Sequence, residues 1–309
     1  MQRAIAAAVL LLLTSACGGQ ETEQSSDGAN ACTADLTQVI GSGPELHGAT
    51  WSPDGRRIAF SAWDGRRTSV YAVTVAGCAV VRIGPRINLN VGSPDWSSAN
   101  AIAFDATAPG GTHQGIYTMT AGGGDVRRVT DGPDLFPEWS PDGTRIAFAR
   151  GGYAEVTDDD PSPAYANRNI WLVSSDGSGV RQVTNGRWHG SAGWSPNGER
   201  LVTDTETGVV ELGVDGSGRR MLVEGDYSDP SWSPDGDLLL VSAGLGLGLG
   251  LAEGGQPPVE PLGTPVGFSP DWSPDGKWIA FTDGENEADL WIVRPDGTGL
   301  RQLTTVRVG

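Results

Sequence analysis

The sequence contains few histidines, cysteines and basic residues. Of its 309 residues, three are His, three are Cys and 21 are Lys or Arg, against 38 Asp and Glu. The formal net charge of −17 repels polyanions such as DNA, and no cluster of basic residues offsets it. The composition therefore excludes a nucleic-acid-binding protein. The acidity fits either solubility alone or attraction of cations and basic partners.

Two chemical signatures are also absent from the sequence. The three histidines have no compact metal-ligand spacing such as His-x-x-x-His, and no Gly-x-Ser-x-Gly marks a hydrolase nucleophile. We therefore expect no cofactor, with a divalent cation as the alternative that stays open.

Long apolar runs are missing after the first residues. The stretch from Ala4 to Leu13 is about ten residues long, too short to span a bilayer. A charged start, a short apolar run and the small residues before Cys17 are typical of a signal peptide. Small residues before a Cys also resemble a bacterial lipobox, although Thr14 stands where Leu is usual. We predict a signal peptide at 1–16 and lipidation at Cys17; plain secretion is the alternative.

The residues after Cys17 are polar and lack periodicity, which predicts a flexible tether over 17–31. Two thiols then remain in an exported protein, and such thiols usually pair. We therefore predict a disulfide between Cys32 and Cys78. The expected location is the cell envelope or periplasm, or the outer surface of the cytoplasmic membrane, with a lipid anchor.

Glycine and tryptophan, by contrast, are abundant and form a repeat. The phrase Trp-Ser-Pro-Asp-Gly, or a close variant, begins at Trp51, Trp96, Trp139, Trp194, Trp232 and Trp272. The copy at Trp96 is degenerate, and the copy at Trp194 has Asn in place of Asp. The steps are 45, 43, 55, 38 and 40 residues, and a period near 40 with several short strands is typical of a propeller.

Each repeat has the same order of elements. Ser-Pro-Asp-Gly is a turn in which Pro presets φ, Asp bonds the backbone and Gly takes a positive φ. A β-type run such as Arg145–Ala149 follows, then a second run such as Ile170–Val173, a Gly hairpin turn and a last short strand. With the strand that carries Trp, the sequence predicts an all-β, six-bladed β-propeller of four-stranded antiparallel blades over 32–309.

Two segments fall outside this order. Leu36–Ile40 resembles the blade endings, and we expect it to pair with the last blade as a closing strap, displacing or adding to Leu300–Thr304. Gly244–Leu251 alternates Gly and Leu, which predicts a strand that is bare on one side; a loose, slipping strand is the alternative.

The Trp-Ser-Pro-Asp-Gly-x-x-Ile-Ala-Phe repeat resembles the propeller repeat of the TolB family. The resemblance covers about residues 36–309 and implies an envelope-associated propeller. TolB carries an additional domain before its propeller, where this sequence has a short tether. The same repeat forms the gate of prolyl-oligopeptidase-type peptidases, whose Gly-x-Ser-x-Gly is missing here.

Antiparallel four-stranded blades place the Ser-Pro-Asp-Gly turns on one face and the variable connections on the opposite face. The insertion from Arg150 to Arg168 belongs to this variable-loop face, as do all three histidines. We predict that the face docks an envelope protein or peptide, on a monomeric propeller. The candidate residues on it are His47, His113, His189, Tyr153, Asp158, Asp159, Asp160 and Tyr165.

The residues just before three of the repeat tryptophans are acidic: Asp95, Glu138 and Asp271. On inner strands they would line the central channel, where together with His47 and His189 they would hold a cation or the basic tip of a peptide. A purely structural role stays open, as does an acid–base enzyme of the lactonase, lyase or glycan-active type. A third alternative is a small-ligand or carbohydrate binder that uses Phe136, Trp188, Tyr227 and Phe268 at the channel mouth.

Overall fold

The structure is a computed structural model. It describes residues 33–40, 46–75, 79–85, 88–151, 168–186, 190–243, 246–251, 260–283 and 289–305. The chain divides into two units, Met1–Ala31 and Cys32–Gly309, and every described residue belongs to the second. The signal peptide, the tether, lipidation at Cys17 and the pairing of Cys32 with Cys78 lie outside the described residues and stay predictions. Among the described residues, none forms a helix with the length and apolarity needed to cross a bilayer.

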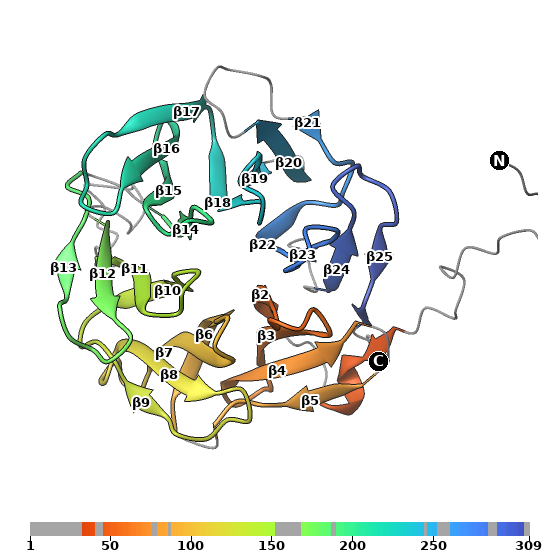
Figure 1. The fold of residues 1–309 in the computed structure, drawn as a ribbon. Helices are drawn as coiled ribbons and strands as arrows, with labels where there is room; N and C mark the ends of the chain where they lie inside the picture. The colour runs from red at the N-terminus through yellow and green to blue at the C-terminus, as the bar shows by residue number, and fades with distance from the viewer. Residues whose placement is uncertain are drawn as a thin grey trace, which may run out of the picture. The chain divides into compact units, whose positions relative to one another are not determined.

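Six four-stranded antiparallel sheets stand around a central axis, as the sequence predicts (Figure 1). In each sheet the strands follow chain order from the axis outward. Blade one consists of β2 (Leu46–Trp51), β3 (Arg57–Trp63), β4 (Thr68–Thr74) and β5 (Val80–Arg82); blade two of β6 (Asn90–Trp96), β7 (Ala101–Thr107), β8 (Gly115–Thr120) and β9 (Arg127–Arg128); blade three of β10 (Asp134–Trp139), β11 (Arg145–Arg150), β12 (Asn169–Ser174) and β13 (Arg181–Gln182).

The remaining three blades repeat this pattern. Blade four consists of β14 (Ala192–Trp194), β15 (Arg200–Thr205), β16 (Gly208–Gly213) and β17 (Arg220–Glu224); blade five of β18 (Tyr227–Trp232), β19 (Leu238–Ala243), β20 (Gly246–Leu251) and β21 (Glu260–Pro261); blade six of β22 (Gly267–Trp272), β23 (Ile279–Asp283), β24 (Leu290–Val293) and β25 (Arg301–Gln302). The alternating segment of blade five is a strand, since β20 pairs with β19 over its whole length.

The Ser-Pro-Asp-Gly phrase folds as the turn that the sequence predicts. In blade three the Ser140 hydroxyl donates to Asp142 at 2.6 Å and accepts the Arg145 amide N–H at 2.9 Å, while Gly143 adopts a φ of +68°. The carboxylate of Asp142 also accepts the Thr144 N–H. The carboxylate of the repeated Asp is therefore engaged in hydrogen bonds that stabilise the turn.

The hydrophobic core lies between neighbouring blades. The phenylalanine of the second strand is fully buried in blades one, two, three and six: Phe60, Phe104, Phe148 and Phe281. The inner strands contact one another in chain order around the axis, and β22 of blade six contacts β2 of blade one. The ring is closed by packing of the last blade on the first.

The N-terminal segment strengthens this closure. β1 (Ala34–Asp35) pairs in parallel with β26 (Thr304–Thr305), which follows β25 in the chain. The two strands form a small sheet of their own, so β1 does not displace β25 as the outer strand of blade six. The predicted strand over Leu36–Ile40 is wrong, because the 3-10 helix η2 (Leu36–Gln38) stands there. Its Leu36 is fully buried in the core between blades six and one.

Candidate functional site

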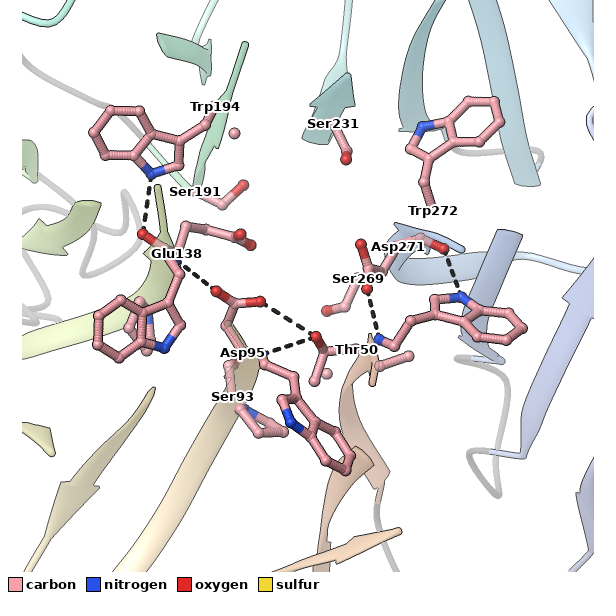
Figure 2. A pocket seen from close by; sticks show the side chains of 18 of the residues that line it. Thr50, Ser93, Asp95, Glu138, Ser191, Trp194, Ser231, Ser269, Asp271 and Trp272 are labelled. Atoms are coloured by element: carbon pink, nitrogen blue, oxygen red, sulfur yellow. Dashed lines mark hydrogen bonds between the residues drawn. The ribbon is translucent and has the colours of Figure 1, made fainter. Parts of the chain in front are cut away.

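A bulge in the inner strands positions the residues before the repeat tryptophans. The pairing register shifts in β2, β6, β10, β18 and β22 within the five residues that precede Trp. At three of these bulges a residue other than Gly adopts a positive φ: Phe136 at 53°, Asp229 at 50° and Ser269 at 48°. A bulge re-aims the side chains beside it, and here the residue just before Trp lines the axis (Figure 2).

These side chains join one blade to the next. In half of the ring, the residue before Trp accepts the amide N–H of the Trp in the following blade. Asp271 accepts from Trp51 at 2.8 Å, Thr50 from Trp96 at 3.0 Å, and Asp95 from Trp139 at 2.5 Å. Asp95 also accepts the Thr50 hydroxyl at 3.2 Å. Asp95 and Asp271 therefore have a structural function as hydrogen-bond caps between blades.

Glu138 stands at the same position in blade three but does not cap the next blade. Its backbone carbonyl accepts the Trp194 indole N–H at 3.0 Å, but its carboxylate makes no hydrogen bond or ion pair with any described residue. In Figure 2 its side chain lies among those that line the axis. Glu138 is thus the carboxylate of the predicted three that is not occupied by a structural contact.

An axial cavity of about 370 Å³ contains these groups. It extends from the bulges to prolines of the Ser-Pro-Asp-Gly turns, and tryptophans of five blades line it. Its charged lining residues among those described are all acidic: Asp95, Glu138, Asp229 and Asp271. No described Lys, Arg or His lines it, so the negative charges have no partner of opposite sign there.

Burial and mutual repulsion make these acids weak. Burial raises the pKa of Asp95 to about 6 and, together with the charge of Asp95, that of Asp271 to about 7. The pKa of Glu138 is raised well above its ordinary value by burial and by the charges of Asp95, Asp271 and Asp229. Burial also raises the pKa of Asp229. The cavity can therefore bind a cation or exchange protons near neutral pH.

The prediction missed Asp229. It stands three residues before Trp232, where the other repeats have Gly, Ser or Phe, and its carboxylate accepts the Ser269 N–H of the next blade at 3.3 Å. An alignment of the six repeats shows that Asp229 is the one acid at this position. Only the bulge explains why a side chain three residues before Trp reaches the cavity. The prediction also missed Asp105, which lies on the second strand β7 and lines a different pocket.

The structure places His47 and His113 away from the acids of the axial cavity. His47 lines another pocket, on the side of the ring where the inner strands begin, and not the axial cavity. His113 lies in the β7–β8 loop with a φ of +57°, and its carbonyl accepts the Tyr117 hydroxyl at 2.9 Å. Within the described part of the chain, no three His, Cys, Asp or Glu side chains form a group that could hold a metal ion.

The other predicted site residues lie outside the described residues: Tyr153, Asp158, Asp159, Asp160, Tyr165, Trp188 and His189. Their roles, in docking for most of them and in a ligand site for Trp188, stay predictions. Of the aromatic residues named for a ligand site, Phe136 lines the axial cavity, whereas Phe268 is exposed and lines neither pocket.

Comparison with known proteins agrees with the geometry. The family model of the TolB β-propeller domain matches residues 24–248, most of the chain. The chain belongs to the TolB β-propeller family.

Two curated relatives match only part of this chain. An uncharacterized peptidase, YuxL, of Bacillus subtilis is 32% identical over 36% of this chain and 17% of its own length. A protein TolB homolog of Chlorobium luteolum is 36% identical over 34% of this chain and 24% of its own length. The chain thus spans about a quarter or less of these relatives. A solved gluconolactonase from Xanthomonas campestris is 15% identical, with a TM-score of 0.62 over 88% of each chain, which shows the fold alone.

Proposed function

We propose that this protein is an exported, lipid-anchored binding module that docks a Lys- or Arg-bearing segment of an envelope protein or peptide in its axial cavity. Membership of the TolB β-propeller family supports a role in the cell envelope, and the apolar start of the sequence supports export.

The carboxylate of Glu138 is the observation that carries the proposal. It is half-buried in a cavity with three other acids. Among the residues that the structure describes, none forms a hydrogen bond with it, and no Lys or Arg lines the same cavity. Without a partner the charged form of this acid is unfavourable, which is why its pKa is raised. A cation that enters the cavity would stabilise the charged form by supplying the missing partner.

The shape of the cavity favours an amino-acid side chain over a bare ion. Trp and Pro side chains surround the carboxylates, and Lys and Arg bury their methylene stems against such surfaces while the charged end reaches an acid. Indole faces also attract organic cations. The buried indole N–H of Trp272 has no acceptor among the described residues, and a carbonyl of an inserted peptide would provide one.

A labelled tetralysine peptide tests the proposal, with tetraglutamine as the uncharged control. We expect fluorescence anisotropy to show binding of tetralysine to the full chain at low salt. Glu138→Gln should weaken binding about tenfold, which corresponds to about 1.4 kcal/mol. Glu206→Gln removes the same charge from an exposed turn and should change little. Equal weakening by both variants, or no binding of tetralysine, would contradict the proposal.

Capture from an envelope extract addresses the natural partner. The immobilised full chain should retain one dominant protein that Glu138→Gln loses and that free tetralysine displaces. Retention of the same protein by both forms would mean that the axial cavity is not the docking site.

Acid–base catalysis is a second candidate, favoured by one observation. Asp95 and Asp271 have pKa values raised to about 6 and about 7, the range of efficient general acids and bases. Turnover of a sugar lactone that disappears in Asp271→Asn would support an enzyme, and its absence in the native protein would argue against one.

A further inference from the structure

A second pocket lies off the axis, between blades one, two and three. Its volume is about 550 Å³, larger than that of the axial cavity, and the residues that line the two do not overlap. We refer to it as the off-axis pocket. Small residues keep it open: Gly92, Ala106 and Gly151 line it. A volume of this size accommodates a small molecule.

The off-axis pocket presents four polar side chains that are not engaged elsewhere. His47 and Thr68 come from blade one, and Asn90 and Gln114 from blade two. None of their side chains forms a hydrogen bond with another described residue. They provide amide, hydroxyl and imidazole groups, which together offer donors and acceptors but no net charge.

The charged groups of the pocket are already occupied. Asp134 is buried and held by Arg150, whose Nε and terminal nitrogen lie 2.6 and 2.7 Å from the two carboxylate oxygens. Asp105 accepts the Ser93 N–H at 3.0 Å. A Cβ on Gly92 would come within 2.0 Å of the second oxygen of Asp105, so the pocket wall is shaped around this carboxylate. No described Lys or Arg lines the pocket. A strongly charged ligand of either sign therefore finds no free partner.

An exposed indole lies next to Thr68, one of the residues that line the pocket. Trp63 is 37% exposed and lies directly opposite Thr68 in the β3–β4 ladder. Residues directly opposite each other have their side chains on the same face of a sheet, so Trp63 lies beside the pocket wall that Thr68 contributes. An aromatic face next to hydroxyl and amide groups suits the C–H surface and the hydroxyls of a sugar ring.

We propose that the off-axis pocket binds a neutral, hydroxyl-rich small molecule of monosaccharide size. The ligand ring stacks on Trp63, and its hydroxyls bond Thr68, Asn90, Gln114 and His47. This site is independent of the axial cavity. Its polar groups and small residues stand at other positions of the repeat than the residues that line the axis.

Saturation-transfer NMR on the full chain tests the proposal, with D-glucose, D-galactose and N-acetyl-D-glucosamine as probes. We expect at least one of them to receive saturation, with a dissociation constant in the millimolar range. Asn90→Leu, Gln114→Leu and Trp63→Ala should each raise that constant about fivefold or more. These residues are half-buried or exposed, so the variants should keep the native thermal unfolding profile.

Two control variants complete the experiment. Phe268→Ala removes another exposed aromatic side chain, one that lines neither pocket, and Glu138→Gln alters the axial cavity; both should bind sugar as the native protein does. No saturation of any probe by the native protein would overturn the proposal. So would sugar binding that the three pocket variants leave unchanged, or that Glu138→Gln or Phe268→Ala abolishes. The three pocket variants should still bind tetralysine. Their tetralysine binding therefore tests the axial cavity separately from the sugar site.

Discussion

At the residue scale, the position before each repeat tryptophan serves two purposes. Asp95, Thr50 and Asp271 cap the backbone of the next blade, whereas Glu138 has the same position and no such bond. A glutamate is one methylene longer than an aspartate and is not held by the neighbouring amide. Residues in equivalent repeat positions can thus be structural in one blade and available for a ligand in another.

Removal of a cap should lower stability. Asp95→Ala loses the bonds from Trp139 N–H and the Thr50 hydroxyl, and we expect the free energy of unfolding to fall by about 2 kcal/mol. Ser231→Ala changes the equivalent position of blade five and should cost less than about 0.5 kcal/mol. Urea unfolding at pH 5 measures the difference. At this pH Asp95 is mostly protonated, so its removal relieves little charge repulsion among the axial acids. Equal costs would show that the caps contribute nothing.

At the element scale, the turns and the closing strap depend on single residues for their stability. Gly55 of the first Ser-Pro-Asp-Gly turn has a φ of +66°, and an added Cβ would meet no atom within 4 Å. The requirement for glycine there is conformational rather than steric. The strap depends instead on burial, because its strand β1 has only two residues.

Alanine at the turn should show the cost of the positive φ alone. We expect Gly55→Ala to lower the free energy of unfolding by about 1 kcal/mol. Gly122→Ala, in another open turn without a positive φ, should have an effect close to zero. Thermal unfolding of both variants checks this, and a neutral Gly55→Ala would refute the conformational explanation.

The strap should depend on one leucine. Leu36 is 0% exposed, and Leu36→Ala should lower the free energy of unfolding by about 3 kcal/mol through the cavity it leaves. Val39, in the same segment, is 44% exposed, and Val39→Ala should have little effect. Similar denaturant midpoints for the two variants would mean that the strap does not contribute to ring closure.

At the scale of the whole molecule, the acid-lined axis links stability to pH. The ordinary pKa of Asp is about 3.9 in an unfolded chain, whereas burial raises that of Asp95 to about 6 and those of Asp271 and Asp105 to about 7. The folded state therefore binds these protons more tightly than the unfolded state. Their stabilising contribution is fully present below about pH 4, near the ordinary pKa, and is lost progressively as the pH rises to the folded-state values of about 6 and about 7.

We accordingly expect the protein to be more stable at pH 5 than at pH 8. Further acidification acts in the opposite direction, because turn acids such as Asp142, whose pKa its hydrogen bonds lower to about 2, contribute stability that is lost as they become protonated. Urea midpoints between pH 4 and 8 measure the profile. Glu138→Gln should flatten the decline above pH 6, and a midpoint that rises towards pH 8 would contradict the expectation.

The amino-acid sequence by itself determined the blades, their turns and the acids before the tryptophans, because each of these depends on short-range chemistry repeated at a regular spacing. Tertiary structure alone decided which acids are capped, since each cap lies on the next blade, more than forty residues away. It also decided that Asp229 reaches the axis and that His47 does not, because the bulge conformations that direct these side chains leave no mark in the residue types. The off-axis pocket likewise exists only where three blades meet.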